Sequence, residues 1–169
     1  MTRYAAFLRA VNVGGTGKLP MAELRAMCEG LGFNKVQTYI ASGNLIFETP
    51  ISAAKAKAAL EGIVAAALGK PAGIFIRDIA ALKGVISANP FPHAEGNRLM
   101  VVLLQTVLVR LMVNAAKFKA DEQMAQGDRC LYVHYPSGMG KSKLKIPGAE
   151  EGTARNMNTM RKMLELLYG

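Results

Sequence analysis

The sequence of 169 residues contains no tryptophan and has only two cysteines and two histidines. Cys28 and Cys130 lie far apart and form no C-x-x-C pair, so we expect two reduced thiols buried in a core. His93 and His134 show neither H-x-H nor H-x-x-x-H spacing. Because a histidine-built metal site needs closely spaced ligands or carboxylate help, the sequence predicts no metal site. No cofactor is predicted either.

Long hydrophobic runs are also missing. The most membrane-like stretch, residues 99–113, is shorter than the roughly 20 residues that cross a bilayer, and Gln105, Thr106 and Arg110 interrupt it. The N-terminal segment MTRYAAFLRAVNV lacks the basic region, long apolar core and cleavage site of a signal peptide. We therefore predict no membrane association and a cytoplasmic location.

Acidic residues are few: 12 Asp and Glu stand against 21 Lys and Arg, which gives a formal net charge of +9. Such a charge attracts phosphate polymers, anionic lipids or acidic small molecules. The alternative is a solvated basic surface without a partner. The carboxylates form no obvious pair for acid–base chemistry and no G-x-S-x-G elbow occurs, so the sequence identifies no catalytic residue.

Residues 1–78 alternate strand-like and helix-like patterns in the order of a ferredoxin-like unit, which is strand, helix, two strands, helix, strand. One helix is predicted between Pro20 and Gly32 and a second between the cap Ser52 and Gly69, because both segments carry an apolar face. The four strand-like runs are residues 4–13, 35–41, 44–49 and 72–77.

The second half repeats this order less clearly. Asp78 is expected to cap a third helix, which the NPFP sequence at 89–92 ends. A hairpin is predicted to turn at Gln126, Gly127 and Asp128. The remaining elements expected here are a strand at 99–104, a helix at about 107–118 and a closing helix that carries Met157, Met160, Leu164 and Leu167.

The predicted fold class is therefore α+β. We expect a ferredoxin-like subdomain at 1–78, a connecting helix and NPFP segment at 79–97, and a smaller α/β subdomain at 98–169 that packs on the first. The C-terminal half is a candidate for a degenerate second ferredoxin-like unit.

The segment that starts at Leu8, LRAVNVGGTGKLP, ends a strand-like run in three glycines and a lysine. A Walker loop requires Gly, four residues and Gly-Lys-Ser/Thr, but Asn12 stands at the first glycine position and Leu19 at the hydroxyl position. The dinucleotide pattern G-x-G-x-x-G also fails, because Pro20 occupies its third glycine position. Neither nucleotide loop is predicted.

An anion site of another kind remains open at this loop. Gly14 and Gly15 let the backbone approach a ligand, a helix start follows, and Lys18 adds a charge. The alternative is that the glycines only turn a strand into a helix. The turn-forming sequence SGN at 42–44 allows the same two interpretations. The run Gly140–Lys145 carries three lysines and no acid, which favours a phosphate-binding loop or a solvated face.

Six segments taken together resemble a known family. LRAVNVGG, LPMAELRAMCEGLGF, VQTYIASGNLIF, NPF, LYVHYPSGMGKSKL and GTARNMNT are similar, in this order, to the bacterial domain-of-unknown-function 1697 family. The resemblance covers essentially the whole chain. It implies an α+β architecture with a ferredoxin-like N-terminal half and a smaller α/β C-terminal half, and it supplies no activity, substrate or cofactor.

The family motif marks polar and glycine residues in several separate segments. Two positions depart from it: Ala10 stands where the family usually has glycine, and Met157 where it usually has tryptophan. The helical spacing of Met157 predicts a core position instead of an aromatic stacking surface. The marked residues are Arg9, Asn12, Gly14, Gly15, Ser42, Gly43, Asn44, Asn89, Pro90, Phe91, Ser142, Lys143, Thr153, Arg155, Asn156, Asn158 and Thr159.

Polar motif residues suggest either a hydrogen-bond network or a ligand pocket, since buried polar groups need partners. In a ferredoxin-like order we place the first strand-to-helix loop and the middle hairpin turn at opposite ends of the sheet. We therefore predict a site near Arg9, Asn12 and Gly14 that forms a shared cleft with the Arg155–Asn156 segment, and Ser42–Asn44 is a second candidate. The NPF segment is predicted to be structural, with Phe91 largely buried. The full candidate ligand-binding set is Arg9, Asn12, Gly14, Gly15, Lys18, Ser42, Asn44, Lys143, Arg155 and Asn156.

Three functions remain open at this point. The basic balance favours a binding module for a phosphate-bearing partner, either nucleic acid or a nucleotide-like ligand. The alternatives are a small-molecule enzyme that uses Arg and Lys as anion clamps, and a structural or homo-oligomer-forming protein with no ligand.

Overall fold

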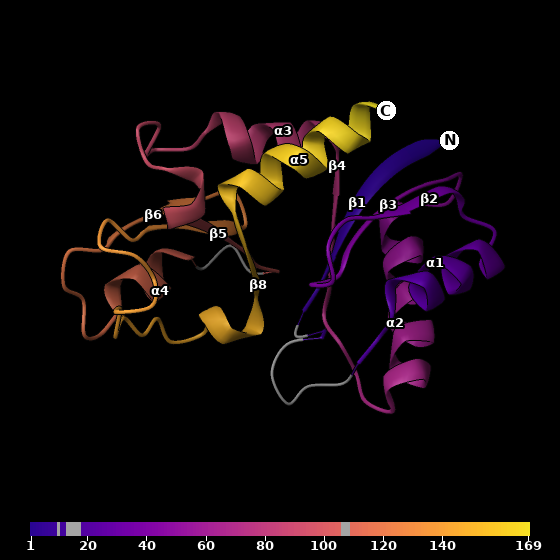
Figure 1. Cartoon of the computed structure of the whole chain (residues 1–169), viewed down its shortest axis with the longest axis horizontal. Coiled ribbons are helices and arrows are strands. Elements are labelled where there is room, and N and C mark those ends of the chain that lie inside the picture. Colours follow the sequence, from indigo (N-terminus) through magenta and orange to yellow (C-terminus); the bar gives the residue numbers. More distant parts are fainter. Residues whose placement is uncertain (10, 13–17, 106–108) are drawn as a thin grey trace. The chain divides into compact units, whose positions relative to one another are not determined.

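A computed structural model of the chain describes residues 1–9, 11, 12, 18–105 and 109–169. The chain divides into two compact units. The first unit comprises Met1–Ala81 and Met163–Gly169, and the second unit comprises Leu82–Lys162. Each unit contains a four-stranded antiparallel sheet with helices (Figure 1). The predicted α+β class is confirmed.

The first unit has the strand order β2-β3-β1-β4, which is the order of a ferredoxin-like sheet. Its chain order is strand, helix, two strands, helix, strand, as predicted. Ser52 caps the second helix, because its Oγ accepts a hydrogen bond from the Lys55 backbone N–H at 3.2 Å. The elements are β1 (Thr2–Leu8), α1 (Met21–Gly30), β2 (Asn34–Thr38), β3 (Asn44–Thr49), α2 (Ala53–Leu68) and β4 (Ile74–Asp78).

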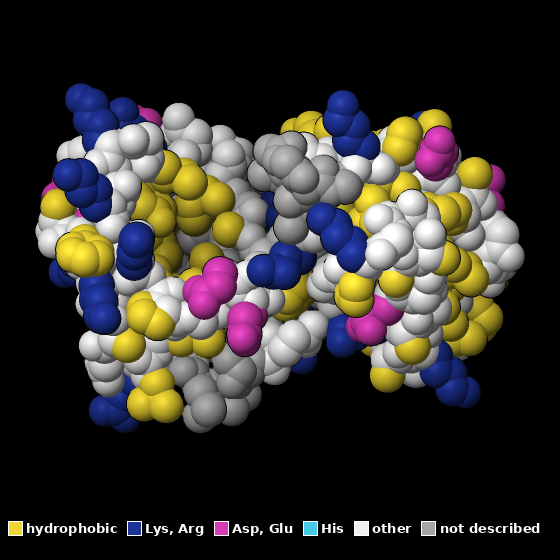
Figure 2. Space-filling view, turned by 90° about the horizontal axis from the view of Figure 1, so that it is seen from below, with side chains coloured by type: hydrophobic (Ala, Val, Ile, Leu, Met, Phe, Trp, Pro, Cys, Tyr) yellow, Lys and Arg dark blue, Asp and Glu magenta, His cyan; other side chains and the backbone are white. Residues whose placement is uncertain are grey.

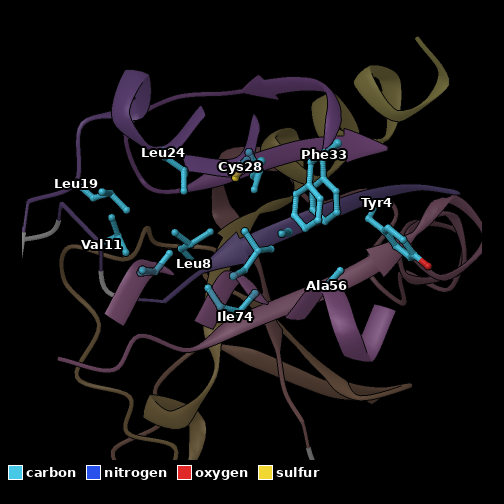
Figure 3. Close-up of a cluster of buried hydrophobic side chains, with 14 residues drawn as sticks. Tyr4, Leu8, Val11, Leu19, Leu24, Cys28, Phe33, Ala56 and Ile74 are labelled. Carbon is cyan, nitrogen blue, oxygen red and sulfur yellow. The ribbon is translucent and has the colours of Figure 1, made fainter. Parts of the chain in front are cut away.

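The main core of the first unit lies between its sheet and the helices α1 and α2, which lie on the same face of the sheet (Figures 1 and 3). Leu24 and Cys28 from α1 meet sheet residues such as Leu8, and all three side chains are fully buried. Phe33 and Phe47 stack with ring centroids 4.4 Å apart and nearly parallel planes. Every second residue of β1, namely Tyr4, Ala6 and Leu8, therefore contributes to the face that the helices cover.

The second unit repeats the same sheet with different coverage. Its strand order β6-β7-β5-β8 corresponds position by position to that of the first unit. No α-helix connects β7 to β8; residues 135–152 form an irregular segment with one short 3₁₀ turn instead. The degenerate second ferredoxin-like unit is thus confirmed. Its elements, with the helices before and after, are α3 (Ile79–Ser87), η1 (Gly96–Arg98), β5 (Leu99–Leu103), α4 (Val109–Asn114), β6 (Gln123–Gly127), β7 (Cys130–His134), η2 (Ala149–Glu151), β8 (Thr153–Asn156) and α5 (Met157–Tyr168).

In this half, two local predictions are confirmed and one is wrong. Asp78 caps α3, since its Oδ1 accepts from the Ala81 backbone N–H at 2.8 Å. Met157 is fully buried, as the helical spacing predicts. The predicted hairpin turn at 126–128 is wrong by one residue: Gly127 pairs with Cys130, so the turn consists of Asp128 and Arg129. Arg129 adopts a left-handed φ of 50° in this turn. The prediction centres the turn on Gly127, because glycine adopts left-handed conformations most easily.

Within the described ranges, no helix combines the length and the apolar character that crossing a bilayer requires.

Candidate functional site

The described part of the first loop is held by the side chain of Asn12. Its Oδ1 accepts from the Leu19 backbone N–H at 2.6 Å, and its Nδ2 donates to the carbonyls of Leu19 at 2.7 Å and Ala41 at 2.9 Å. Asn12 also has a φ of 57°, a left-handed conformation that Asn tolerates better than most residues. Asn12 therefore closes the loop by its own bonds. The predicted residues Gly14 and Gly15 lie outside the described residues.

The SGN sequence fastens the β2–β3 turn to the end of β1. The Leu8 N–H donates to the Gly43 carbonyl at 2.8 Å. Gly43 has a φ of 89°, and a Cβ there would lie 2.8 Å from the Leu8 Cβ, so only glycine fits. Asn44 is fully buried, and its Nδ2 donates to the Tyr39 carbonyl at 2.9 Å and to the Ser42 Oγ at 3.1 Å.

The expectation that these two loops lie at opposite ends of the sheet is wrong. The bond from Asn12 to Ala41 and the bond from Leu8 to Gly43 place them side by side. The physical reason is strand direction: β1 and β2 are each antiparallel to β3, so the end of β1 and the end of β2 point the same way.

Arg9 and Lys18 complete the described part of the predicted site in the first unit. The Arg9 N–H donates to the Gly73 carbonyl at 2.9 Å, and the Arg9 side chain is half-buried. A Cβ at Gly73 would lie 3.3 Å from the Arg9 Cβ, so the arginine stem packs along that glycine. Lys18 is exposed. The structure thus gathers Arg9, Asn12 and the SGN turn at one end of the first sheet.

Arg155 and Asn156 belong to the second unit. Arg155 is 8% exposed, and its Nη1 donates to the Thr153 Oγ1 at 2.6 Å and to the Ala154 carbonyl at 2.9 Å. Burial lowers the pKa of the Arg155 guanidinium to about 10, so the group remains charged at neutral pH. The Asn156 Oδ1 caps α5 by accepting from the Thr159 N–H at 2.9 Å. The cleft that we predict between Arg9 and Arg155 stays a prediction.

The lysine-rich run of the family motif is anchored by an acid that sequence reasoning missed. Glu122 is 3% exposed, and its two carboxylate oxygens accept from the Ala120 N–H at 2.7 Å and the Ser142 Oγ at 2.8 Å. The Ala120 hydrogen bond, followed by that of Ser142, lowers the pKa of the Glu122 carboxyl below its usual value of 4.5. Because 20 residues separate Ser142 from Glu122, no local pattern reveals this pairing.

The hydrogen bond between Glu122 and Ser142 links two segments of the second unit, residues 117–122 and 141–145. Both segments carry exposed lysines. Lys117 and Lys145 form an antiparallel bridge, with backbone hydrogen bonds of 2.8 and 2.9 Å. We call the exposed lysines of these segments the lysine surface. Figure 2 shows dark blue side chains around a hydrophobic hollow in the half that carries α4 and β6. The lysine surface consists of Lys117, Lys119, Lys141, Lys143 and Lys145.

An aromatic side chain stands within the lysine surface. Phe118 lies between Lys117 and Lys119 and is 66% exposed. Its φ of 59° is left-handed, which is unusual for a bulky residue and raises the energy of the folded chain. The sequence signal that could have found this residue is an aromatic flanked directly by two lysines.

The NPF segment forms a turn beside the two histidines. The Asn89 Oδ1 accepts from the Phe91 N–H at 2.8 Å, which closes an Asx turn. Phe91 is half-buried and not largely buried as predicted, because one side of its ring lines an open pocket with His93 and His134. Sequence spacing gave no sign of this proximity, since 41 positions separate the two histidines.

The two cysteines are free and buried, as expected. Burial raises the pKa of the Cys28 thiol to about 12, so the thiol stays protonated and is a poor nucleophile. Among the residues that the structure describes, no three His, Cys, Asp or Glu side chains come together as metal ligands.

Comparisons with known proteins agree with this architecture. A family model, "Protein of unknown function (DUF1697)", matches residues 1–132. The structure of the conserved bacterial protein SP0830 from Streptococcus pneumoniae is similar, with a TM-score of 0.83 and 26% sequence identity, over 98% of each chain. No curated protein matches the sequence.

Proposed function

The chain belongs to the DUF1697 family of proteins of unknown function, and we propose that it binds single-stranded nucleic acid through the lysine surface of its second unit. The observation that supports this most directly is Phe118, an exposed aromatic ring held between Lys117 and Lys119. Single-strand binding combines a positively charged track for the phosphates with aromatic rings on which bases stack. Here the five lysines would contact the phosphates, and the ring of Phe118 would stack on a base.

Acids do lie near this surface: Glu150 lines a pocket with Lys117 and Lys145, and the charge of Lys119 acts on Glu122. Across the described ranges, none of its five lysines lies in a salt bridge. Two nearby acids are engaged otherwise: Glu122 is buried and bonded to Ser142, and Asp121 accepts a hydrogen bond from the Ser137 hydroxyl. Unpaired surface lysines attract a polyanion and release its counterions on contact.

Phe118 gains little from its position in the free protein. Phe118 is 66% exposed and therefore buries little apolar area, and a left-handed backbone costs on the order of 1–3 kcal/mol. Stacking of a base on an aromatic ring contributes about 1–3 kcal/mol, which is enough to offset that cost in a complex.

A single strand fits this surface better than a duplex. All five lysines lie outside the α-helices, on residues 117–119 and 141–145. Duplex readout in the major groove relies on an inserted helix or β-ribbon, and bases in a duplex are stacked on each other. An exposed ring on a loop stacks more readily with bases that are already unstacked, because inserting it into a duplex costs the energy of unstacking a base step.

The test is the salt dependence of binding to labelled oligothymidylates of two lengths, followed by fluorescence anisotropy. On single strands each neutralised phosphate contributes about −0.7 to the slope of log K against log salt, so five contacts give about −3.5. The Lys141→Ala, Lys143→Ala, Lys145→Ala triple variant should flatten the slope by about 2.

A charge-matched control separates the surface from the net charge. Lys55, Lys70 and Lys83 are exposed on other segments, and their triple alanine variant loses the same charge. We expect its slope to stay near that of the wild type. Weak, salt-insensitive binding of both lengths, or equal losses in the two triple variants, contradicts the proposal.

A further inference from the structure

A small pocket in the second unit contains both histidines of the chain. It has a volume of about 250 Å³ and is lined by residues 90–94, Gln123 and His134. Pockets that hold drug-sized molecules usually measure about 300–1,000 Å³, so this one suits a single flat ring system.

One wall of the pocket is aromatic. The rings of Phe91 and His134 have centroids 5.8 Å apart and planes inclined by 34°. The Asn89 turn holds Phe91 in place through the 2.8 Å bond to its backbone N–H, and the Phe91 carbonyl accepts from the Ala94 N–H at 3.0 Å. The ring is thus presented by a fixed turn.

The polar wall offers both a donor and an acceptor. His134 Nδ1 lies 3.1 Å from Gln123 Oε1, so the ring donates there and its neutral form carries the acceptor lone pair on Nε2. The Gln123 amide nitrogen is a donor. Nucleobases display donors and acceptors side by side on their edges, which is the pattern that such a pair recognises.

The pocket lies at the end of the β6–β7 pair from which the chain continues toward the lysines on both sides. Gln123 and His134 are paired across β6 and β7, at the start of β6 and the end of β7. Lys119 precedes Gln123 by four residues, which span at most about 14 Å. Lys141 follows His134 along the chain, beyond the segment that Ser137 ties to Asp121. A strand held at Lys119 therefore lies within reach of the pocket.

We propose that the His93–His134 pocket binds one nucleobase of the strand held by the lysine surface. This inference rests on the function proposed above. Phe91 supplies the stacking contact, and Gln123 with His134 supplies hydrogen bonds to the edge of the base. The lysines give affinity without regard to sequence, and the pocket adds selectivity for the base.

The experiment uses uncharged nucleosides, which have no phosphate for the lysines to bind. Adenosine and cytidine are titrated at millimolar concentration into the full chain, and the imidazole Cε1–H signals of His93 and His134 are followed by NMR. Since these are the only two histidines, the spectrum contains no other such signals. We expect a saturable shift of both signals by at least one nucleoside.

The Gln123→Ala variant should weaken this binding about fivefold, as the loss of one neutral hydrogen bond does. Gln126→Ala is the matched control, because Gln126 is exposed on the same strand but does not line the pocket. Absence of a shift, or equal affinity in both variants, overturns the pocket proposal even if oligonucleotides bind. Conversely, nucleoside binding without oligonucleotide binding overturns the proposed function and leaves the base-binding pocket standing.

Discussion

The side chain of Asn12 pairs with Leu19 in the way that a neighbouring strand residue would, accepting from its N–H at 2.6 Å and donating to its carbonyl at 2.7 Å. The same amide reaches the Ala41 carbonyl at 2.9 Å, so one residue ties two loops together. These bonds give Asn12 a structural role of its own.

The first prediction concerns this amide. Asn12→Ala should lower the free energy of unfolding by about 1–3 kcal/mol, because it leaves partly buried backbone groups without partners. Asn12→Asp keeps the acceptor but loses the donor, and we expect an intermediate loss. Urea unfolding followed by circular dichroism measures both. A stable Asn12→Ala protein would contradict the structural role of the amide.

A second prediction tests the contact between Gly43 and β1. Gly43→Ala places a methyl group 2.8 Å from the Leu8 Cβ on a backbone with φ of 89°, so we expect a loss of more than about 1 kcal/mol. Gly62→Ala, inside α2 with no atom within 4 Å of the new methyl group, should instead stabilise by about 1 kcal/mol. Thermal unfolding of the two variants gives the comparison, and equal midpoints would contradict it.

A third prediction separates folding from binding at Phe118. Phe118→Gly removes a left-handed phenylalanine, so the variant should be at least as stable as the wild type. Its affinity for single-stranded DNA should fall by about 1–3 kcal/mol as the stacking ring is lost. Phe118→Tyr keeps the ring and should keep the affinity. A destabilised Phe118→Gly variant with unchanged affinity would mean that the ring is structural.

The fourth prediction concerns pH. Folding lowers the pKa of Glu122, so the ionised carboxylate stabilises the protein fully above its ordinary value of 4.5. That contribution is lost as the pH falls through the lower value of the folded state. The difference in unfolding free energy between the wild type and Glu122→Gln should therefore be largest near neutral pH and shrink below 4.5.

Sequence patterns predicted the fold better than they predicted the site. The apolar periodicity and the caps Ser52 and Asp78 are local signals, and the structure places both caps at helix starts. The order of elements then determines a ferredoxin-like sheet. The loop after β1 and the β2–β3 turn were wrongly placed at opposite ends of the sheet. Their true positions follow only when the directions of β1, β2 and β3 are considered together.

The contacts that shape the candidate sites are long-range. Ser142 reaches Glu122 across 20 residues, and His134 lies beside Phe91 only because the turn at Asn89 returns the chain to β7. Phenylalanine does not favour a left-handed backbone, so the φ of 59° at Phe118 is imposed by the surrounding chain. Local spacing carries none of this information, because each relationship depends on how distant segments pack.

The two sheets share one strand order, but only the first has a helix in its second crossover. In the first unit, a substitution on the buried face of α2 has to preserve the fit against the strands beneath it. In the second unit, residues 135–152 are held by hydrogen bonds such as that from Ser142 and by packing of Tyr135, Leu144 and Ile146 against the hydrophobic core. Loops tolerate replacement and insertion more readily than packed helices. Relatives of this chain should consequently keep the motif residues Ser142 and Lys143, and vary most in length and composition over residues 145–151, where changes leave both sheets intact.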